Sequence, residues 1–417
     1  MKGQISLSAI DVGNSRIRIL SAKLEPESDQ LKITGFTEIP SFGVRKGIIV
    51  DTTEAIHSIT KALEENQRTI GEEIENVWAS VDGAHFESQN SKGVIAVSRA
   101  DNEISEDDLA RVEEAAQAIS LPNNREILHV TPRSYTIDGQ EGIKDPLGMS
   151  GIRLEADNNI ITASTPILKN LAKCLNQANV DVEEFIASPL AASSAVLSQR
   201  QKELGTVVID IGSATTGIAV YFEGEIFYLN VLPIGSAHIT NDIAIALRTS
   251  VDTAEKIKLE YGFANAAEID KKEKIPLGQL EPKNPEAETE ISRKEVAKVI
   301  EARVREILDL VQKELKKIGY SEQLPAGAIL TGGGSKLPGI VDLAKDELGL
   351  PAQVGFPLEL KGITDKLDDP ACATVIGLLI YAGNNLKGNK AEIINKFKGS
   401  GGKLTERLKK WFRSFMP

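Results

Sequence analysis

The stretch Ala9-Ile10-Asp11-Val12-Gly13-Asn14-Ser15 ends an apolar run near the start of the chain, and a second stretch repeats its design. The second is Val208-Ile209-Asp210-Ile211-Gly212-Ser213-Ala214-Thr215-Thr216, and a glycine loop, Ile329-Leu330-Thr331-Gly332-Gly333-Gly334-Ser335, follows farther along. Each stretch predicts a buried strand that runs into a tight polar turn. The repeat predicts a duplicated half-domain, in which one turn from each half grips opposite sides of a single ligand.

The chemistry of these turns favours a ligand with a phosphate tail. Backbone N–H groups in tight turns bind phosphate when the chain approaches closely, and glycine permits that approach. Asp11 and Asp210 are the predicted Mg²⁺ residues, acting through water because Mg²⁺ keeps much of its hydration shell. Residues 13–15 and 212–216 would surround the phosphates, with residues 332–335 beneath the base and ribose. The alternative, three unrelated glycine turns, explains a single loop well and three loops in this order poorly.

The composition is that of a soluble globular chain with room for about two to four domains. The chain has 417 residues, 41% hydrophobic and 26% charged, and its net charge of −12 argues against a protein that coats nucleic acid. No export signal is evident, and no apolar run reaches the ~18 residues that span a bilayer. Cys174 and Cys372 show no metal spacing or disulfide pattern, so we expect a reducing cytoplasm and no zinc site.

Hydrophobic periodicity predicts a strand pair over residues 5–20, a helix over 52–66 and a compact insert over 83–160. Within the insert, Ser105-Glu106-Asp107-Asp108 is a capping-box start for a helix. The remaining expectations are a strand end and helix over 185–197, amphipathic helices over 252–262 and 292–318, an exposed loop over 270–290, and a short buried helix or strand over 373–383.

With its three loops in this order, the chain resembles the actin-like ATPase superfamily. Other stretches are similar, more narrowly, to the FtsA family of bacterial cell-division proteins. They are Ser80-Val81-Asp82-Gly83-Ala84-His85, Ser91-Lys92-Gly93, Ile127-Leu128-His129-Val130-Thr131-Pro132, residues 138–155 (DGQEGIKDPLGMSGIRLE) and residues 330–339 (LTGGGSKLPG). The resemblance covers about residues 5–383 and the C-terminal tail.

This resemblance implies an α/β, actin-like fold of duplicated ribonuclease-H-like halves, with an inserted 1C domain and a C-terminal amphipathic helix. The implied divisions are subdomain 1A at residues 1–82 and 161–200 with a helix around 370–383, 1C at 83–160, 2A at 201–240 and 326–369, 2B at 241–325, a flexible linker at 384–402 and the helix at 403–417.

The resemblance also implies an adenosine side to the site. Glu255 and Lys258 lie at i and i+3 of a predicted helix, where family members contact ribose and base; the alternative is a solvated charged face. The chain departs from the family at Asn14 (usually Thr), at Arg16 (usually Lys), and at Ser213, Ala214 and Gly217, where the family has Gly, Gly and Asp. We expect ATP binding to survive and hydrolysis to be slow or absent, and we assign no catalytic residue.

The tail predicts a helix that lies on a membrane. Over residues 403–416 the apolar side chains recur at helical spacing, with basic side chains on the other face, although the rest of the chain is acidic. The predicted membrane-contacting residues are Leu404, Arg407, Leu408, Lys409, Lys410, Trp411, Phe412, Arg413 and Phe415. Anionic lipid is the expected partner, and a filament that presents many tails would bind more firmly than a monomer. The alternative is a last helix that docks on the body.

The resemblance implies further partners: the C-terminal peptide of FtsZ on residues 241–325, later division proteins on residues 83–160, and other copies of the chain. We expect Arg293, Lys294 and Arg303 to contact the peptide, against the alternative of an ordinary charged helix face. The implied function is an ATP-binding, filament-forming tether for the FtsZ ring, peripheral on the cytoplasmic face of the membrane at the division site. Rival interpretations are a sugar-kinase-like enzyme, a chaperone ATPase and a pilus-assembly actin-like protein.

Overall fold

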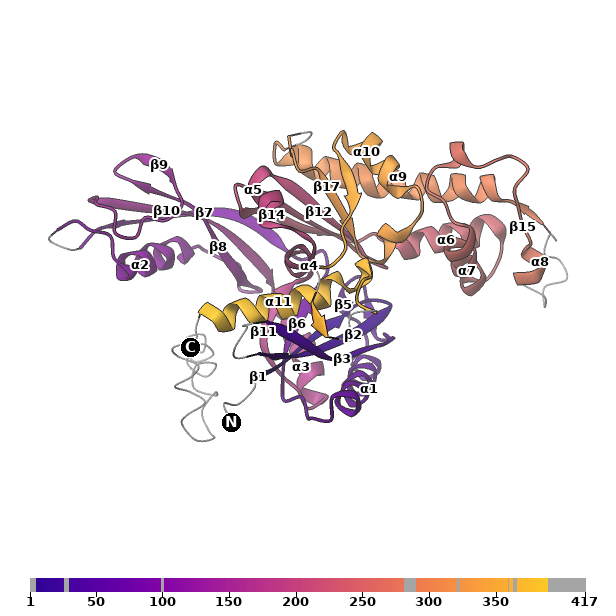
Figure 1. Cartoon of the computed structure of the whole chain (residues 1–417), viewed down its shortest axis with the longest axis horizontal. Helices are drawn as coiled ribbons and strands as arrows, with labels where there is room; N and C mark the ends of the chain where they lie inside the picture. Colours follow the sequence, from indigo (N-terminus) through magenta and orange to yellow (C-terminus); the bar gives the residue numbers. More distant parts are fainter. Residues whose placement is uncertain are drawn as a thin grey trace.

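The computed structural model describes residues 5–25, 30–98, 101–280, 290–320, 323–358, 360–362 and 366–388. Within these ranges, two sheets of similar design form two halves, and a third sheet extends away from them as an arm (Figure 1). The predicted amphipathic helix over 403–417 lies outside the described residues, as does the predicted linker beyond residue 388.

Half one is built on a sheet of strand order β11-β6-β1-β2-β3-β19. Its strands are β1 Ile5–Val12, β2 Arg16–Leu24, β3 Leu31–Pro40, β6 Asn76–Val81, β11 Asp181–Ala187 and β19 Lys361–Gly362, with a small hairpin of β4 Val44–Arg45 and β5 Ile48–Ile49. Strands β1, β2 and β3 are antiparallel, whereas β6 and β11 are parallel to β1. Helices α1 (Thr52–Ile70) and α3 (Thr165–Gln177) pack on one face and α11 (Ala373–Gly388) on the other.

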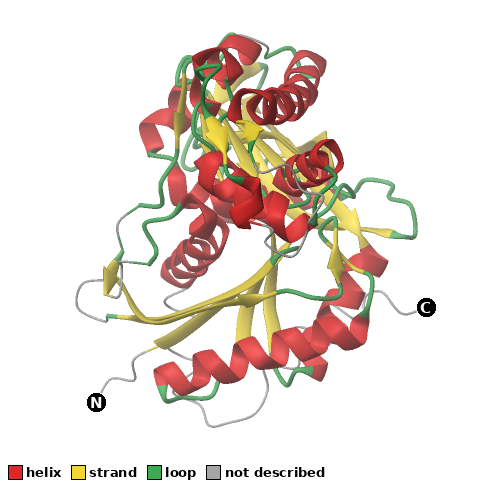
Figure 2. Cartoon of the chain, turned by 90° about the vertical axis from the view of Figure 1, so that its right-hand side faces the viewer, coloured by secondary structure: helices red, strands yellow, loops and turns green. Residues whose placement is uncertain are grey.

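Half two repeats this order as β14-β13-β12-β17-β18, again with an antiparallel trio followed by parallel strands. The strands are β12 Thr206–Ile211, β13 Thr216–Phe222, β14 Glu225–Leu232, β17 Ala328–Thr331 and β18 Ala352–Val354. The helices are α4 Ser188–Val196, α5 Gln199–Leu204, α6 Ser236–Leu247, α7 Val251–Tyr261, α8 Leu277–Leu280, α9 Arg293–Lys317 and α10 Ile340–Leu348. The 3₁₀ turns are η1 Ala266–Glu268, η2 Gly333–Lys336 and η3 Pro370–Cys372. A short antiparallel pair consists of β15 Lys274–Ile275 and β16 Ile291–Ser292. Figure 2 shows helices flanking the strands of both halves. The duplication predicted from the loops is therefore present in the strand order.

The arm is inserted between β6 and α3. Its sheet has the order β7-β10-β8-β9, with β7 Glu87–Ala96, β8 Arg125–Ile137, β9 Gln140–Ile143 and β10 Arg153–Ser164, and helix α2 (Glu106–Gln117) covers one face. The capping box predicted at Ser105 is present: its hydroxyl accepts from Asp108 N, and the Asp108 carboxylate accepts from Ser105 N. A small separate core containing Val112, Leu154 and Tyr135 holds the arm together.

Two helices cross at the centre of the molecule and join the halves. Helices α4 and α11 approach so closely that a Cβ on Gly377 would lie 1.7 Å from Ala191 O. Only a glycine fits such an approach, because real Cβ atoms do not come within about 3 Å of a backbone oxygen. The two helices share one core with the sheets of both halves, including Val208 and Ile329 from half two.

Most of the expected elements are present, with three differences. Helix α1 runs four residues past the predicted end, to Ile70, and the segment over 373–383 is a helix that continues to Gly388. The exposed loop predicted over 270–290 is found at residues 270–272, but the prediction is wrong at Ile275 and Leu277, which are buried in β15 and α8. These two apolar side chains join the core beneath α9. Sequence periodicity missed them because most of their neighbours in the sequence are charged or polar.

Candidate functional site

The two predicted turns close equivalent hairpins at the mouth of one cleft. Gly13 N donates to Arg16 O at 3.1 Å at the end of β1, and Gly212 N donates to Thr215 O at 2.9 Å at the end of β12. Both loops line a cleft of about 1170 Å³ between the halves. The structure therefore places the two turns across one cavity, as the sequence predicts.

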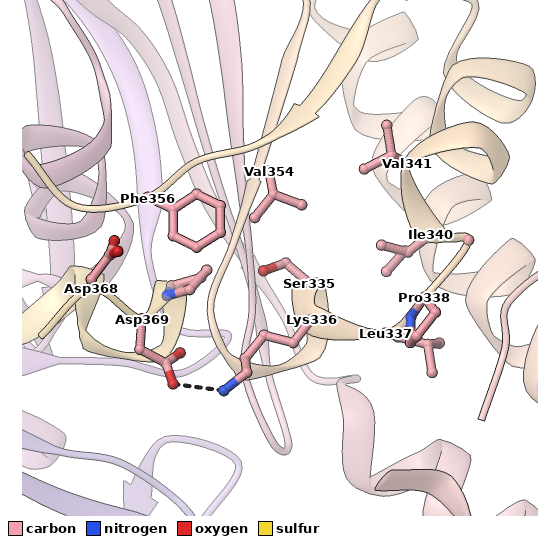
Figure 3. A pocket seen from close by; sticks show the side chains of 12 residues that line it. Ser335, Lys336, Leu337, Pro338, Ile340, Val341, Val354, Phe356, Asp368 and Asp369 are labelled. Carbon is pink, nitrogen blue, oxygen red and sulfur yellow. Dashed lines mark hydrogen bonds and ion pairs between the residues drawn. The ribbon is translucent and has the colours of Figure 1, made fainter. Parts of the chain in front are cut away.

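The third loop lies against the acid of half two. Gly332 has φ +78°, in the left-handed region that favours glycine, and a Cβ there would lie 2.2 Å from Asp210 Oδ1. Gly332, Gly333 and Gly334 line the cleft, whereas Ser335 faces a neighbouring pocket of about 400 Å³ (Figure 3). The Ser335 hydroxyl donates to Gly332 O at 2.8 Å, so this predicted site residue holds the loop in shape.

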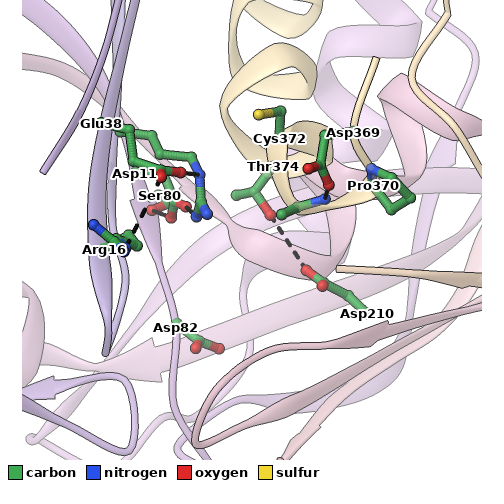
Figure 4. Close-up of polar contacts among 12 residues, drawn as sticks. Asp11, Arg16, Glu38, Ser80, Asp82, Asp210, Asp369, Pro370, Cys372 and Thr374 are labelled. Carbon is green, nitrogen blue, oxygen red and sulfur yellow. Dashed lines mark hydrogen bonds and ion pairs between the residues drawn. The ribbon is translucent and has the colours of Figure 1, made fainter. Parts of the chain in front are cut away.

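Three carboxylates, those of Asp11, Asp82 and Asp210, line the cleft (Figure 4). Burial, together with the negative charges of Asp82 and Asp11, raises the pKa of Asp210 to about 7. Burial also raises the pKa of Asp11, against the lowering effect of Arg18. Buried like charges disfavour ionisation, so this cluster would favour a bound cation.

Each carboxylate accepts hydrogen bonds from nearby hydroxyls. Ser80 Oγ donates to Asp11 Oδ1 at 2.7 Å, and Thr374 Oγ1 donates to Asp210 Oδ2 at 3.2 Å. Because Thr374 lies on α11, which packs on the half-one sheet, the second bond ties half one to half two.

Asp82 makes a second tie between the halves, and sequence reasoning did not place it in the site. Its Oδ2 accepts from Thr215 Oγ1 of half two at 2.6 Å, and its Oδ1 accepts from Ser188 Oγ at 3.1 Å. Asp82 follows β6 and Ser188 follows β11, so both come directly after a buried strand. Neither stretch has the Asp-x-Gly pattern that identified Asp11, so the sequence signal for these two residues is only a polar side chain after an apolar run.

Arg18 is the cation nearest the half-one acid. Its Nε lies 2.7 Å from Glu38 Oε2, and its guanidinium lies 4.0 Å from Asp11 Oδ2. Arg16, predicted as a nucleotide contact, lines the cleft and lies 3.9 Å from Glu38 Oε1.

The adenosine-side prediction places Glu255 and Lys258 correctly on one face of α7, in the cleft wall. Lys258 Nζ lies 2.7 Å from Glu255 Oε2 and donates to Thr240 Oγ1 at 2.9 Å. Thr240 Oγ1 in turn donates to Glu255 Oε2 at 2.5 Å. This triangle holds both charged groups at the cleft wall, with the Lys258 side chain largely buried and the Glu255 side chain 42% exposed.

Most of the predicted nucleotide residues line the cleft, and three, Ala214, Thr216 and Ser335, do not. The lining residues among them are Asp11, Gly13, Asn14, Ser15, Arg16, Asp210, Gly212, Ser213, Thr215, Glu255, Lys258, Gly332, Gly333 and Gly334. Thr216 is fully buried, with its hydroxyl donating to Ile234 O at 2.8 Å, and Ala214 lies in the loop outside the lining set. At Gly217 a Cβ would lie 2.7 Å from Pro189 Cγ, so the aspartate usual in the family would require α4 to move.

The residues predicted to contact a peptide each have a partner within the chain. Arg303 makes a two-pronged ion pair with Asp242, at 2.6 and 2.9 Å, that joins α9 to α6. Arg293 Nη1 contacts Glu273 at 2.6 Å, and Lys294 Nζ donates to Ile269 O at 2.9 Å. Arg303 thus has a structural role that a peptide contact would have to share.

Two further kinds of site, a metal centre and a membrane span, are absent from the described residues. No group of three His, Cys, Asp or Glu side chains there is arranged to hold a metal directly. No described helix is long and apolar enough to cross a bilayer.

Two halves of one strand order, closed on a cleft by matching Asp-x-Gly hairpins, define an actin-like fold. Two solved structures share it. The PilM-PilN type IV pilus biogenesis complex has a TM-score of 0.63 at 15% identity, covering 91% of this chain and 99% of that one. MreB5 of Spiroplasma citri bound to ADP has a TM-score of 0.54 at 12% identity, covering 93% and 98%.

Sequence comparison narrows the class to one family. The family model for cell division protein FtsA matches residues 207–377, and the model for the SHS2 domain inserted in FtsA matches residues 83–162. Cell division protein FtsA of Pseudomonas aeruginosa is 36% identical over 406 residues, 96% of each chain. That of Bacillus subtilis is 37% identical over 379 residues, 91% of this chain and 84% of the relative. The chain belongs to the FtsA family of cell division proteins, which confirms the predicted family and the actin-like fold with its inserted domain.

Proposed function

We propose that the chain binds ATP with Mg²⁺ in the cleft, forms filaments on the cytoplasmic face of the membrane, and tethers the FtsZ ring at the division site. The main support is the pair of hydrogen bonds that cross between the halves, Thr215 to Asp82 and Thr374 to Asp210. Both lie where the two hairpin loops face one cavity, so a ligand held by both loops would fix the halves relative to each other.

The donor set suits a triphosphate with its metal. Backbone N–H groups of residues 13–15 and 212–215 would hold the phosphates, and Asp11 and Asp210 would hold Mg²⁺ through water. The raised pKa of Asp210, caused by burial and two nearby carboxylates, indicates an anionic pocket that a divalent cation would neutralise. Lys258 and Glu255 would contact the ribose. When bound, Mg²⁺ would screen the phosphate charge.

We expect hydrolysis to be slow or absent in this chain. Gly217 sits opposite Asp210 in the β12–β13 register, where a family aspartate would add a carboxylate near the metal. Rapid ATP turnover by the purified protein would contradict this part of the proposal.

Membrane attachment is the element that separates a tether from the rival enzymes. The test is pelleting with anionic vesicles in the presence of ATP, with the full chain compared with a version that ends at Gly402. Trp411→Glu, on the predicted apolar stripe, should abolish pelleting, whereas Ser414→Glu, which adds the same charge off the stripe, should weaken it much less. Equal pelleting by the full and shortened chains would overturn the attachment.

The FtsZ contact needs a test that leaves α9 intact. Because Arg303 joins α9 to α6, its removal would disturb the helix as well as any peptide contact. Lys294→Ala is the cleaner change, and Lys298→Ala, an exposed lysine on the same helix paired with Glu295, is its control. Fluorescence polarisation with a labelled FtsZ C-terminal peptide should show weaker binding for Lys294→Ala alone. Equal losses from both variants would indicate charge attraction without a specific contact.

A further inference from the structure

The inserted arm departs from half one, yet its root packs on half two. Strands β7, β8 and β10 each contact β14, which is the outer strand of the half-two sheet (Figure 1). The arm therefore connects the halves a second time, in addition to the crossing of α4 and α11.

The root of the arm is held by a stacked cation and a buried amide. The Arg133 guanidinium on β8 lies 4.3 Å from the centre of the Phe227 ring on β14, and Asp157 on β10 lies 4.0 Å from Arg133 Nη1. Asn159 is fully buried and donates from Nδ2 to Ile226 O at 3.3 Å. A cation over an aromatic face that is also near a carboxylate has a fixed position, so this contact sets the angle at which the arm leaves the body.

A second contact lies at the turn between β13 and β14. Lys144, one residue past β9, donates from Nζ to Glu223 O at 2.7 Å and lies 3.6 Å from Glu223 Oε2. Together with the Arg133 contact, it holds the arm at two points along its length, which resists rotation better than a single point.

Strand β13 connects this turn directly to the cleft. It begins at Thr216, immediately after the phosphate loop, and ends at Phe222, next to the residue that holds Lys144. The strand is paired on both sides, with β12 and β14, so it transmits movement as a rigid element. Glu223 lies about 23 Å along the strand from Thr216, at roughly 3.3 Å per residue. A shift of residues 212–215 around a ligand would therefore also move Glu223.

We propose that β13 couples the inserted arm to the nucleotide cleft, so that ATP in the cleft and a protein bound to the arm change each other's affinity. The proposal rests on the ATP binding proposed above. The effect is reciprocal by thermodynamic linkage: if ATP favours one position of the arm, a protein that binds this position raises the affinity for ATP.

The first test releases the arm. The double variant Arg133→Ala/Lys144→Ala should speed amide hydrogen exchange in residues 223–228 and raise the release rate of fluorescent ATP, each by about fivefold. The control is Lys92→Ala, which removes an exposed lysine from β7 of the same arm. Circular dichroism of the full chain checks that both variants fold. Unchanged exchange at residues 223–228 would overturn the docking contact, whether or not the chain binds ATP.

The second test fixes the arm. Lys144→Cys with Glu223→Cys, joined by a short bismaleimide, should slow ATP release. Cys174 is buried, but Cys372 lines the cleft, so the parent chain treated with the same reagent is the control. If exchange responds to the first variant but ATP release responds to neither change, the coupling is overturned. If the parent chain binds no ATP, the proposed function fails and the coupling fails with it, while the exchange result still judges the contact.

Discussion

The two Asp-x-Gly hairpins close with the same backbone hydrogen bond but differ in the residue that lies opposite the acid. In half one the residue paired with Asp11 across the strands is Arg18, and in half two the residue paired with Asp210 is Gly217. Arg18 partly offsets the effect of burial on Asp11, whereas Asp210 faces two other carboxylates and its pKa rises to about 7. The duplication thus preserves the loop geometry, whereas the residue opposite the acid is an arginine in one copy and a glycine in the other.

This difference indicates a division of labour between the loops. The half-one acid is held by an arginine and a serine that come from its own sheet, so its position does not depend on half two. The half-two acid accepts a hydrogen bond from Thr374 of α11, so its position depends on how the halves meet. Perturbing each acid separately should therefore give unequal results.

The largest effect on stability is expected at Gly332, where an added Cβ would collide with Asp210. Gly332→Ala would place a Cβ 2.2 Å from Asp210 Oδ1 at φ +78°, and we expect a loss of roughly 4 kcal/mol in free energy of unfolding, together with loss of ATP binding. The matched control is Gly333→Ala, whose Cβ would meet only the Ala371 methyl, at 3.9 Å. Denaturant unfolding measures both, and equal stability of the two variants would contradict the contact.

A smaller effect should separate the acids by pH. Asp210 has a pKa of about 7 when folded against an ordinary value of 3.8, so the folded chain binds more protons and its free energy of unfolding falls as pH rises between those values. The amide of Asp210→Asn does not ionise, so this variant avoids that loss. The difference in free energy of unfolding between the variant and the parent should be larger at pH 8 than at pH 5 by roughly 2–3 kcal/mol.

Asp11→Asn is the comparison for that experiment. It also removes a buried charge, but it deprives Arg18 of a partner, so its pH-dependent gain should be the smaller of the two. Urea unfolding at both pH values, without nucleotide or magnesium, gives the comparison. Equal gains for the two variants would mean that Arg18 does not compensate Asp11.

The smallest effect concerns the hydroxyl donors. Ser80→Ala removes a 2.7 Å bond to Asp11, and Thr374→Val removes a 3.2 Å bond to Asp210. Each should cost about 1–2 kcal/mol of stability, with Ser80→Ala the larger. Thr374→Val alone should also weaken ATP binding, because its bond joins the halves; if Ser80→Ala weakens binding as much, the division of labour is wrong.

The fold was largely predictable because its decisive features are local. A strand that ends in Asp-x-Gly is recognisable in the sequence of both halves. The four residues from Ser105 form a capping box, which predicts the start of α2. The burial of Ile275 and Leu277 was missed because it depends on packing against α9, which begins only at Arg293.

The site was predictable along each loop and not across the cleft. Asp82 follows β6, more than a hundred residues before Thr215, and the hydrogen bond between them follows only from how the two sheets meet. The intramolecular pairs of Arg293 and Arg303 were hidden for the same reason, because Glu273 and Asp242 lie on other elements. Periodicity reports which face of a helix is charged, but it does not identify the partner.

The contact between Gly377 and Ala191 fixes α11 close to its cleft end. Thr374 lies three residues before this contact, about 4.5 Å along the axis, whereas Gly388 lies eleven residues beyond it, about 16.5 Å away. Because α11 also packs on β1, β2 and β6, it belongs to half one as a single rigid body. Any closure of the halves around a ligand would therefore carry Gly388 along with half one.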